Sequence, residues 1–147
     1  MSIRDLLQNR KPLVTVDVDA MVAVAVERMA EADIGAVLVM DEGEIVGIFT
    51  ERDCLQKVAR KSLSTAITPL RQVMTSNVRY ATHDQSVEDC MRLMTERYFR
   101  HLPVLDEHGT LLGIVSIGDL VKARLSEQKF VIEQMEHYIA DSLPVTR

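Results

Sequence analysis

Two short motifs in the chain place a carboxylate three positions after a hydroxyl residue, and each follows an apolar run. The first is Thr50-Glu51-Arg52-Asp53 behind Gly47-Ile48-Phe49, and the second is Ser116-Ile117-Gly118-Asp119 behind Gly113-Ile114-Val115. This pattern predicts a strand that ends in the hydroxyl residue and a helix that begins directly behind it. Free amides at a helix N-terminus attract a phosphate, the hydroxyl adds a donor, and a carboxylate accepts hydrogen bonds from a ribose diol.

The same spacing also describes a capping box. In that motif the hydroxyl accepts from a free amide of the first turn, and the acid reaches back to the amide of the capping residue. Capping and ligand binding use one geometry and do not exclude each other. Both interpretations of Asp53 and Asp119 are therefore open at this point.

Composition and charge limit the classes of function. The 147-residue chain carries 17 Lys and Arg against 22 Asp and Glu, which gives a formal net charge of −5. Because no basic stripe is present to release counterions, we expect no nucleic-acid partner and no membrane partner. We find neither an apolar run of membrane length nor a secretory leader, and we expect a cytoplasmic protein.

No catalytic or metal-binding motif is recognisable in the sequence. Cys54 and Cys90 lack the close pairing of a zinc site or a redox pair. Cys90 aligns with Ala25 in the repeat described below, which favours a buried thiol. No nucleophile, base and orienting group occur in a known order, and no Gly-rich phosphate loop is present. We therefore expect no enzymatic activity, no metal and no catalytic cofactor.

An internal repeat organises the chain. A shift of 65, growing to 66 after His108, aligns residues 14–58 with residues 79–124, and 11 of the 45 pairs are identical. The identities fall on turns, on core positions and on the two motifs, where Asp53 matches Asp119. A duplicated fold is expected to keep these positions.

Each repeat is predicted to fold as β-α-β-β-α. Extended segments at 13–18 and 78–81 lead to helices that we expect Asp19 and Asp84 to cap. Apolar strands at 36–40 and 102–105 then turn through Gly-containing hairpins into strands at 45–49 and 111–115. The apolar spacing of the first helix in each repeat predicts these core positions: Val22, Val26 and Met29, and Val87, Met91 and Met94.

The last predicted helix runs from Asp119 to about Ala140 without a breaker. Its apolar residues form one stripe, made of Val121, Leu125, Ile132, Met135 and Ile139. A single repeat does not need a helix of this length. We therefore expect its second half to pack on a partner subunit in a homodimer.

The repeated units, the strand entry His101-Leu102-Pro103-Val104, the Asp-Glu-x-Gly turn and the Gly-Ile-x-Thr/Ser-x-x-Asp exits resemble the cystathionine-β-synthase (CBS) domain. The two copies resemble a tandem CBS domain pair, or Bateman module, over about residues 6–125. The resemblance implies an α+β fold in which two repeats are related by a pseudo-twofold and a long C-terminal helix follows. The expected boundaries are 6–60 for repeat 1, 61–74 for a linker with a short helix, 75–125 for repeat 2, and 126–147 for the helix extension and tail.

CBS pairs are regulatory modules that bind adenosine-containing ligands, among them AMP, ADP, ATP, S-adenosylmethionine and NAD(H), in clefts between repeats. The resemblance implies that Asp53 and Asp119 bind ribose hydroxyls and that Thr50 and Ser116 face phosphate. It implies further contacts at the strand entries and at the linker end, namely Gly35, Ala36, Val37, Arg100, His101, Leu102, Pro103 and Thr75.

The two repeats match the family pattern unequally. Gly35-Ala36-Val37 stands where repeat 2 has Arg100-His101-Leu102, so the phosphate side of repeat 1 has fewer cationic donors. Arg52 is either a compensating cation or a solvated arginine of the first helical turn. Two equal sites are therefore not expected.

The leading hypothesis is a regulatory module in which a bound adenine nucleotide changes how repeats and subunits pack, and a target protein reads that change. The alternative is a ligand-independent dimerisation or adaptor module in which both aspartates only cap helices. A hydrolase acting on a bound nucleotide is disfavoured, because no catalytic group is recognisable.

Overall fold

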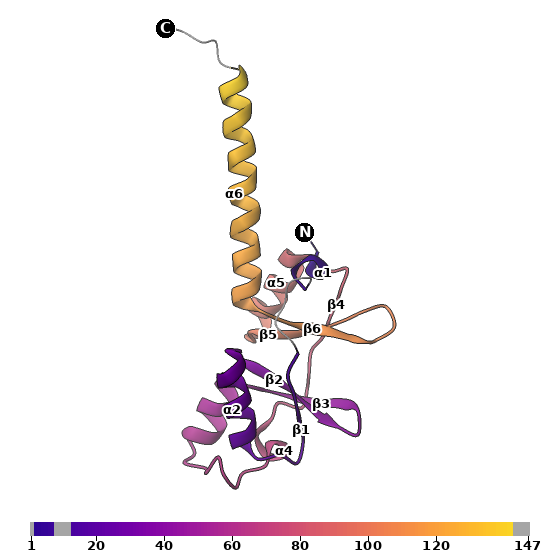
Figure 1. The fold of residues 1–147 in the computed structure, drawn as a ribbon, viewed down its shortest axis with the longest axis vertical. Coiled ribbons are helices and arrows are strands. Elements are labelled where there is room, and N and C mark those ends of the chain that lie inside the picture. The colour runs from indigo at the N-terminus through magenta and orange to yellow at the C-terminus, as the bar shows by residue number, and fades with distance from the viewer. Residues whose placement is uncertain (1, 8–12, 143–147) are drawn as a thin grey trace. The chain divides into compact units, whose positions relative to one another are not determined.

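The computed structural model describes residues 2–7 and 13–142, so the predicted tail after residue 142 lies outside the described residues. The described residues form two units with separate cores (Figure 1). We call residues 13–80 the first unit, and residues 2–7 together with 81–142 the second unit. Each unit contains one of the two sequence repeats.

The first unit has a three-stranded sheet in the order β1-β2-β3. Strand β1 (Thr15–Asp17) runs parallel to β2 (Ala36–Asp41), and β2 pairs antiparallel with β3 (Glu44–Thr50). Because parallel strands need a crossover, α2 (Val22–Ala32) connects β1 to β2. Behind β3 the chain forms α3 (Glu51–Asp53), the π-helix η1 (Cys54–Ala59) and α4 (Leu70–Val73).

The second unit repeats this plan. Its sheet has the order β4-β5-β6, with β4 (Ala81–Thr82) parallel to β5 (His101–Leu105) and β5 antiparallel to β6 (Leu111–Ser116). Helix α5 (Val87–Arg97) connects β4 to β5, and α6 (Ile117–Ser142) follows β6. These units confirm the predicted α+β fold of tandem repeats with a long C-terminal helix.

Both hairpins turn at the predicted Gly-containing segments. In the first unit Asp41 pairs with Glu44, and the two residues between them, Glu42 and Gly43, have φ of 49° and 82°. Two left-handed residues in succession form the turn type that matches the twist of a hairpin. Gly109 serves the second hairpin with φ of 78°.

A short helix that was not predicted completes the second unit. Helix α1 (Ile3–Leu6) lies at the start of α5 as α4 lies at the start of α2, because Ser2 bridges to Ser86 and Pro69 bridges to Met21. The amide of Ile3 donates to the carbonyl of Gln85 at 3.0 Å, as the amide of Leu70 donates to the carbonyl of Ala20 at 2.9 Å. Both apolar side chains are fully buried. Each unit is therefore completed by the segment that precedes the other repeat in the chain.

Two predictions about the helices of the repeats were wrong. Neither Asp19 nor Asp84 caps a helix, because α2 and α5 begin three residues later, and α5 uses the hydroxyl of Ser86 as its cap. The Asp84 carboxylate instead accepts from the Thr82 hydroxyl at 2.7 Å, which lowers the pKa of Asp84. The second wrong prediction concerns Val26, which was expected in the core and is 36% exposed.

The core face of α2 instead consists of Val22, Ala25 and Met29, which are all buried. The spacing of three and then four residues is also helical. The sequence alone allowed a buried stripe on α2 through either Val26 or Ala25. Packing against the sheet buries Ala25.

We expect Ile3→Ala to destabilise the second unit, because the substitution leaves a cavity in a core where Ile3 is fully buried. The loss in the free energy of unfolding should be about 2–5 kcal/mol, measured by urea denaturation. The control is Ile67→Ala, which removes the same side chain where it is 78% exposed and should cost less than about 0.5 kcal/mol.

Thiol labelling localises the effect. Cys90 lies in the same core as Ile3 and is 1% exposed. Its labelling rate should rise in Ile3→Ala, while that of Cys54, in the first unit, should not. Unchanged stability together with unchanged labelling of Cys90 would show that α1 is not part of this core.

Candidate functional site

The first predicted motif forms a complete capping box. Thr50 ends β3 and caps α3, and its Oγ1 accepts from the amide of Asp53 at 3.1 Å. In return, Oδ2 of Asp53 accepts from the amide of Thr50 at 3.1 Å and from its hydroxyl at 3.2 Å. The capping interpretation of this motif is therefore confirmed. We call residues 50–53 the first corner.

Asp53 is a buried carboxylate, with 7% of the residue exposed. Its second oxygen, Oδ1, accepts from the hydroxyl of Thr75 at 3.0 Å and lies 3.1 Å from Nζ of Lys57. The same Nζ donates to Oγ1 of Thr75 at 3.3 Å. A buried charge requires such partners, because burial removes it from water. Lys57 is therefore the counter-charge of the first corner.

Thr75 reaches this corner because its backbone is paired with β3. The amide of Thr75 donates to the carbonyl of Ile48, and the amide of Ile48 donates to the carbonyl of Thr75, both at 2.9 Å. The crossing segment passes close to Gly47, where a methyl group would lie 2.6 Å from Sδ of Met74 and 3.0 Å from the carbonyl oxygen of Thr75. Glycine at this crossing thus avoids a close contact that any side chain would make with Met74 and Thr75.

The predicted strand-entry residues of the first repeat lie beside the same corner. Ala36 pairs directly with Thr50 in the β2–β3 ladder, and the carbonyl of Gly35 accepts from the amide of Glu51 at 3.0 Å. Val37 is fully buried and packs in the core. Arg52 lies exposed in the first helical turn.

The second predicted motif has the same geometry, and we call residues 116–119 the second corner. Oδ2 of Asp119 accepts from the amide of Ser116 at 2.8 Å, and Oγ of Ser116 accepts from the amide of Asp119 at 3.1 Å. The carbonyl of Arg100 accepts from the amide of Ile117 at 2.8 Å, and His101 pairs directly with Ser116. This arrangement brings a guanidinium-bearing residue and an imidazole-bearing residue to one corner.

The remaining two residues of the second strand entry contribute to the interior. Leu102 is fully buried in the core of the second unit, and Pro103 is buried opposite Ile114. Like Val37 in the first unit, Leu102 packs its side chain into the core, whereas Pro103, the next residue along the strand, belongs to the opposite face of the sheet.

The helices behind the two corners differ, which the sequence analysis did not anticipate. In η1 the amide of Arg60 donates to the carbonyl of Leu55, five residues back, whereas α6 is a regular α-helix. Lys57 aligns with Ala123, which is buried, while the first unit buries Val58 instead, one position later. The wider turn therefore leaves Lys57 half-buried beside Asp53. A basic residue four positions after Asp53 was the sequence signal for this contact.

Neither thiol is activated. Burial raises the pKa of Cys90 to about 11, in agreement with the predicted buried thiol. Burial and the neighbouring Asp53 charge raise the pKa of Cys54. A thiol with a raised pKa carries less of the reactive thiolate at neutral pH.

The described residues lack the features of a metal centre and of a membrane span. They contain no group of three or more His, Cys, Asp or Glu that could hold a metal ion. None of the helices formed by these residues is long and apolar enough to cross a membrane.

The model of the CBS domain family matches residues 3–60 and 70–126 of this chain. The two matches begin at α1 and α4, the short helices that complete the units, and they cover most of the chain. The chain therefore belongs to the CBS domain family and contains two CBS domains.

Solved structures of CBS proteins resemble this chain. A protein with CBS domains from Burkholderia ambifaria MC40-6 has 42% sequence identity and a TM-score of 0.82, with coverage of 87% of this chain and 96% of that one. The structure of CBSX2 in complex with AMP has 28% identity and a TM-score of 0.69, covering 86% of this chain and 98% of that one.

Curated relatives belong to the same family. An uncharacterized 17.7 kDa protein of Acidianus ambivalens is 37% identical over 116 residues, which are 78% of this chain and 65% of that protein. The mitochondrial CBS domain-containing protein CBSX3 of Arabidopsis thaliana is 35% identical over 120 residues, or 78% of this chain. The matched part is only 58% of CBSX3, so this chain spans about three fifths of the length of these two relatives.

We expect Gly47→Ala to destabilise the first unit, because the added methyl group has no room beside Met74 and Thr75. Overpacking of this kind costs about 1–3 kcal/mol in the free energy of unfolding, measured by urea denaturation. Gly118→Ala is the control, since its methyl group would meet only Oγ of Ser116 at 3.6 Å. That helical substitution should be neutral or stabilise by up to about 1 kcal/mol. Equal stability of the two variants would contradict the close crossing at Gly47.

Proposed function

We propose that this chain is a regulatory CBS-pair module that binds an adenosine-containing ligand and signals by a conformational change to a target protein. The observation that carries this proposal is the second corner, where Ser116 and Asp119 lie beside the strand entry of Arg100 and His101. A carboxylate suits a ribose diol, and cationic donors suit a phosphate. A site that offers both the carboxylate and the cationic donors therefore fits a nucleotide better than a site that offers only one of them.

AMP is the first ligand to test, because CBSX2 has been solved in complex with AMP. ADP, ATP and NAD(H) share its adenosine and are the other candidates. We propose ligand contacts through Arg100, His101, Ser116 and Asp119, with Leu102 and Pro103 forming the strand beneath. A corresponding set in the first repeat consists of Gly35, Ala36, Val37, Thr50, Arg52, Asp53 and Thr75. The proposed role of both sets is binding without chemistry.

A ligand-independent adaptor is the second candidate function. It is favoured by the complete capping box at Thr50 and Asp53, in which every contact of the carboxylate described above is made within the first unit. In that case both aspartates serve only the fold.

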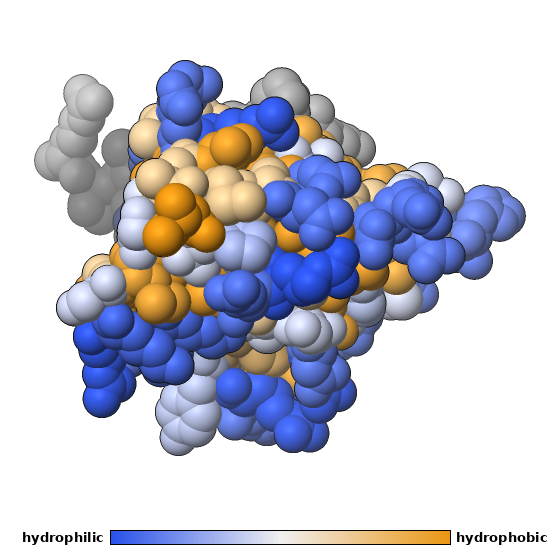
Figure 2. Space-filling model, turned by 90° about the horizontal axis from the view of Figure 1, so that it is seen from below, coloured by the Kyte–Doolittle hydropathy of each residue, from blue (hydrophilic) through white to orange (hydrophobic). Residues whose placement is uncertain are grey.

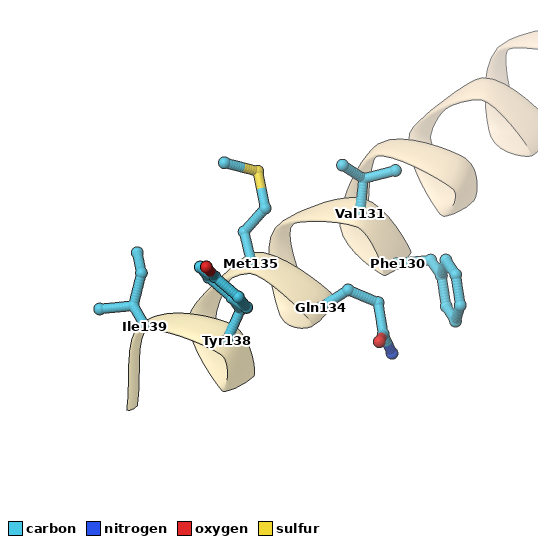
Figure 3. A pocket seen from close by; sticks show the side chains of 6 residues that line it. All are labelled: Phe130, Val131, Gln134, Met135, Tyr138 and Ile139. Carbon is cyan, nitrogen blue, oxygen red and sulfur yellow. The ribbon is translucent and has the colours of Figure 1, made fainter. Parts of the chain in front are cut away.

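We further propose that the chain forms a homodimer through α6. Beyond the second core this helix exposes a series of large apolar side chains: Leu125, Phe130, Val131, Ile132, Met135, Tyr138 and Ile139. Figure 3 shows Val131, Met135 and Ile139 projecting from the same side of the helix, where they help to line a pocket. By contrast, the face of the molecule in Figure 2 carries apolar patches that are interrupted by hydrophilic side chains.

The spacing on α6 favours a second copy of the same helix as the partner. Val121, Leu125, Gln128, Ile132, Met135 and Ile139 alternate at intervals of four and three residues. This 3.5-residue period is the pattern by which two helices pack knobs into holes. An identical helix is self-complementary in such a pairing, as a twofold dimer requires.

We expect Asp119→Ala to weaken nucleotide binding far more than folding. Charge-assisted hydrogen bonds to a ribose diol are worth about 1.5–3 kcal/mol, or roughly ten- to a hundredfold in affinity. Loss of the cap should cost only about 1 kcal/mol of stability. AMP, ATP and NADH are titrated calorimetrically into wild type, Asp53→Ala and Asp119→Ala.

Asp119→Asn is the matched variant, because it keeps an acceptor for the amide of Ser116 and removes the charge. This variant should be as stable as wild type. It should still bind AMP at least tenfold more weakly, because an uncharged acceptor makes weaker hydrogen bonds to the ribose diol. The ribose assignment fails if Asp119→Ala binds every ligand like wild type, or if wild type binds none.

The proposed wild-type dimer should shift towards monomer in the variant Ile132→Glu, measured by sedimentation velocity. The substitution places a charge among the apolar side chains of α6 that repeat at intervals of four and three residues. Truncation after Arg124 should do the same. His137→Glu is the control, since this position lies outside the series of four and three and should leave the sedimentation coefficient unchanged. A wild-type monomer, or an Ile132→Glu dimer of unchanged stability, would overturn the assignment of α6 to the interface.

A further inference from the structure

We propose that Lys57 makes the first corner selective for phosphorylated nucleosides over neutral ones. This inference rests on the proposed function, because it assigns a ligand class to the Asp53 site. In the structure, the Lys57 ammonium and the Thr75 hydroxyl both contact Oδ1 of Asp53. Thr50 contacts Oδ2 twice, through its amide and its hydroxyl. We call this arrangement the closed corner.

A neutral ribose diol has no acceptor position to use in the closed corner. An ionised carboxylate offers about four lone-pair positions, and Lys57, Thr75 and the two groups of Thr50 supply four donors. The two Thr50 contacts belong to the capping box and hold the strand-to-helix turn. Thr75 is held by its backbone pairing with Ile48. Lys57 is therefore the partner that must leave when a diol binds.

The departure of Lys57 costs least when another anion receives its ammonium group. Its side chain is 38% exposed, so the ammonium has room to swing away from Asp53 on a flexible stem. Without a new partner, its departure strips the Asp53 carboxylate, whose side chain is only 10% exposed, of its counter-charge. A phosphate on the incoming ligand replaces the carboxylate as the partner of the ammonium. Adenosine carries the diol but no anion, whereas AMP carries both.

The second corner has no such lysine. Ala123 stands at the position that aligns with Lys57, and a methyl group cannot donate to Asp119. The first repeat alone has an ammonium group four residues after the corner aspartate. The selectivity that we assign to this group is therefore specific to the first repeat. The π-helical turn of η1 is what leaves Lys57 half-buried beside Asp53, because the burial that falls on Ala123 in α6 falls on Val58 in η1.

The test is a titration of the full chain with adenosine and with AMP, followed by two-dimensional NMR of backbone amides. Thr50 and Thr75 report on the first corner, and Ser116 reports on the second. In wild type the first-corner amides should respond to AMP with at least tenfold higher affinity than to adenosine. In Lys57→Met adenosine should gain at least tenfold at these amides, and the preference for AMP should fall below threefold. Lys61→Met, with the same loss of charge at an exposed position, should behave like wild type.

Lys57→Gln tests the same inference if Lys57→Met does not give a dispersed spectrum, because glutamine keeps a hydrogen-bond donor and removes the charge. The inference is overturned if the first corner of wild type binds adenosine as well as AMP, or if the lysine variants keep the full preference for AMP. A response of Ser116 to AMP in that case leaves the proposed function intact. If the Ser116 amide responds to no nucleotide while the Thr50 amide changes as expected, the second corner is not a binding site and the role of Lys57 is supported. No response at any of these amides in any variant overturns both.

Discussion

The reciprocal hydrogen bonds between a hydroxyl residue and an aspartate hold the end of each sheet to the helix behind it. At both corners the acid accepts from the backbone amide three residues earlier, and the hydroxyl accepts from the amide of the acid. The amide that follows the hydroxyl residue donates to the carbonyl of the residue just before the neighbouring strand, from Glu51 to Gly35 and from Ile117 to Arg100. Strand end, helix start and strand entry are thereby fixed together. Any ligand group bound at a corner meets donors and acceptors whose positions are already set by the fold.

A corner that caps a helix and also binds a ligand must share its acceptor positions between the two tasks. In the first repeat the capping box uses one oxygen of Asp53, while Thr75 and Lys57 use the other. The second repeat keeps the capping box and has an alanine where the lysine stands. Two corners with one backbone geometry therefore differ in the residue four positions after the acid, a lysine in one and an alanine in the other. Duplication of a fold conserves the hydrogen bonds that build it and leaves nearby side chains to diverge.

The exchange of short helices links the two repeats through their cores. Ile3 precedes the first repeat and is buried in the second unit, while Leu70 precedes the second repeat and is buried in the first unit. Removal of either segment exposes the core of the other repeat. The stability of each unit thus depends on residues that lie outside its own repeat in sequence.

Much of this protein follows from the sequence alone, because the signals concerned are local. Apolar alternation, Gly-containing turns and the Thr/Ser-x-x-Asp spacing predicted the strands, the hairpins and the two corners. Repetition at a constant shift predicted that Asp53 and Asp119 would occupy equivalent positions. The family itself followed from the ordered combination of these signals in two copies.

Only the tertiary structure decided which residues complete these elements, because that choice depends on packing between distant segments. Asp19 and Asp84 satisfied a capping rule in sequence, yet both lie before the true start of their helices. Val26 and Ala25 each fit a helical stripe, and contact with the sheet selected Ala25. Lys57 stays half-buried beside Asp53 because η1 buries Val58, one position later than the buried Ala123 of α6. Neither the turn width nor the arrival of Thr75 from the linker is encoded by a pattern within the corner motif.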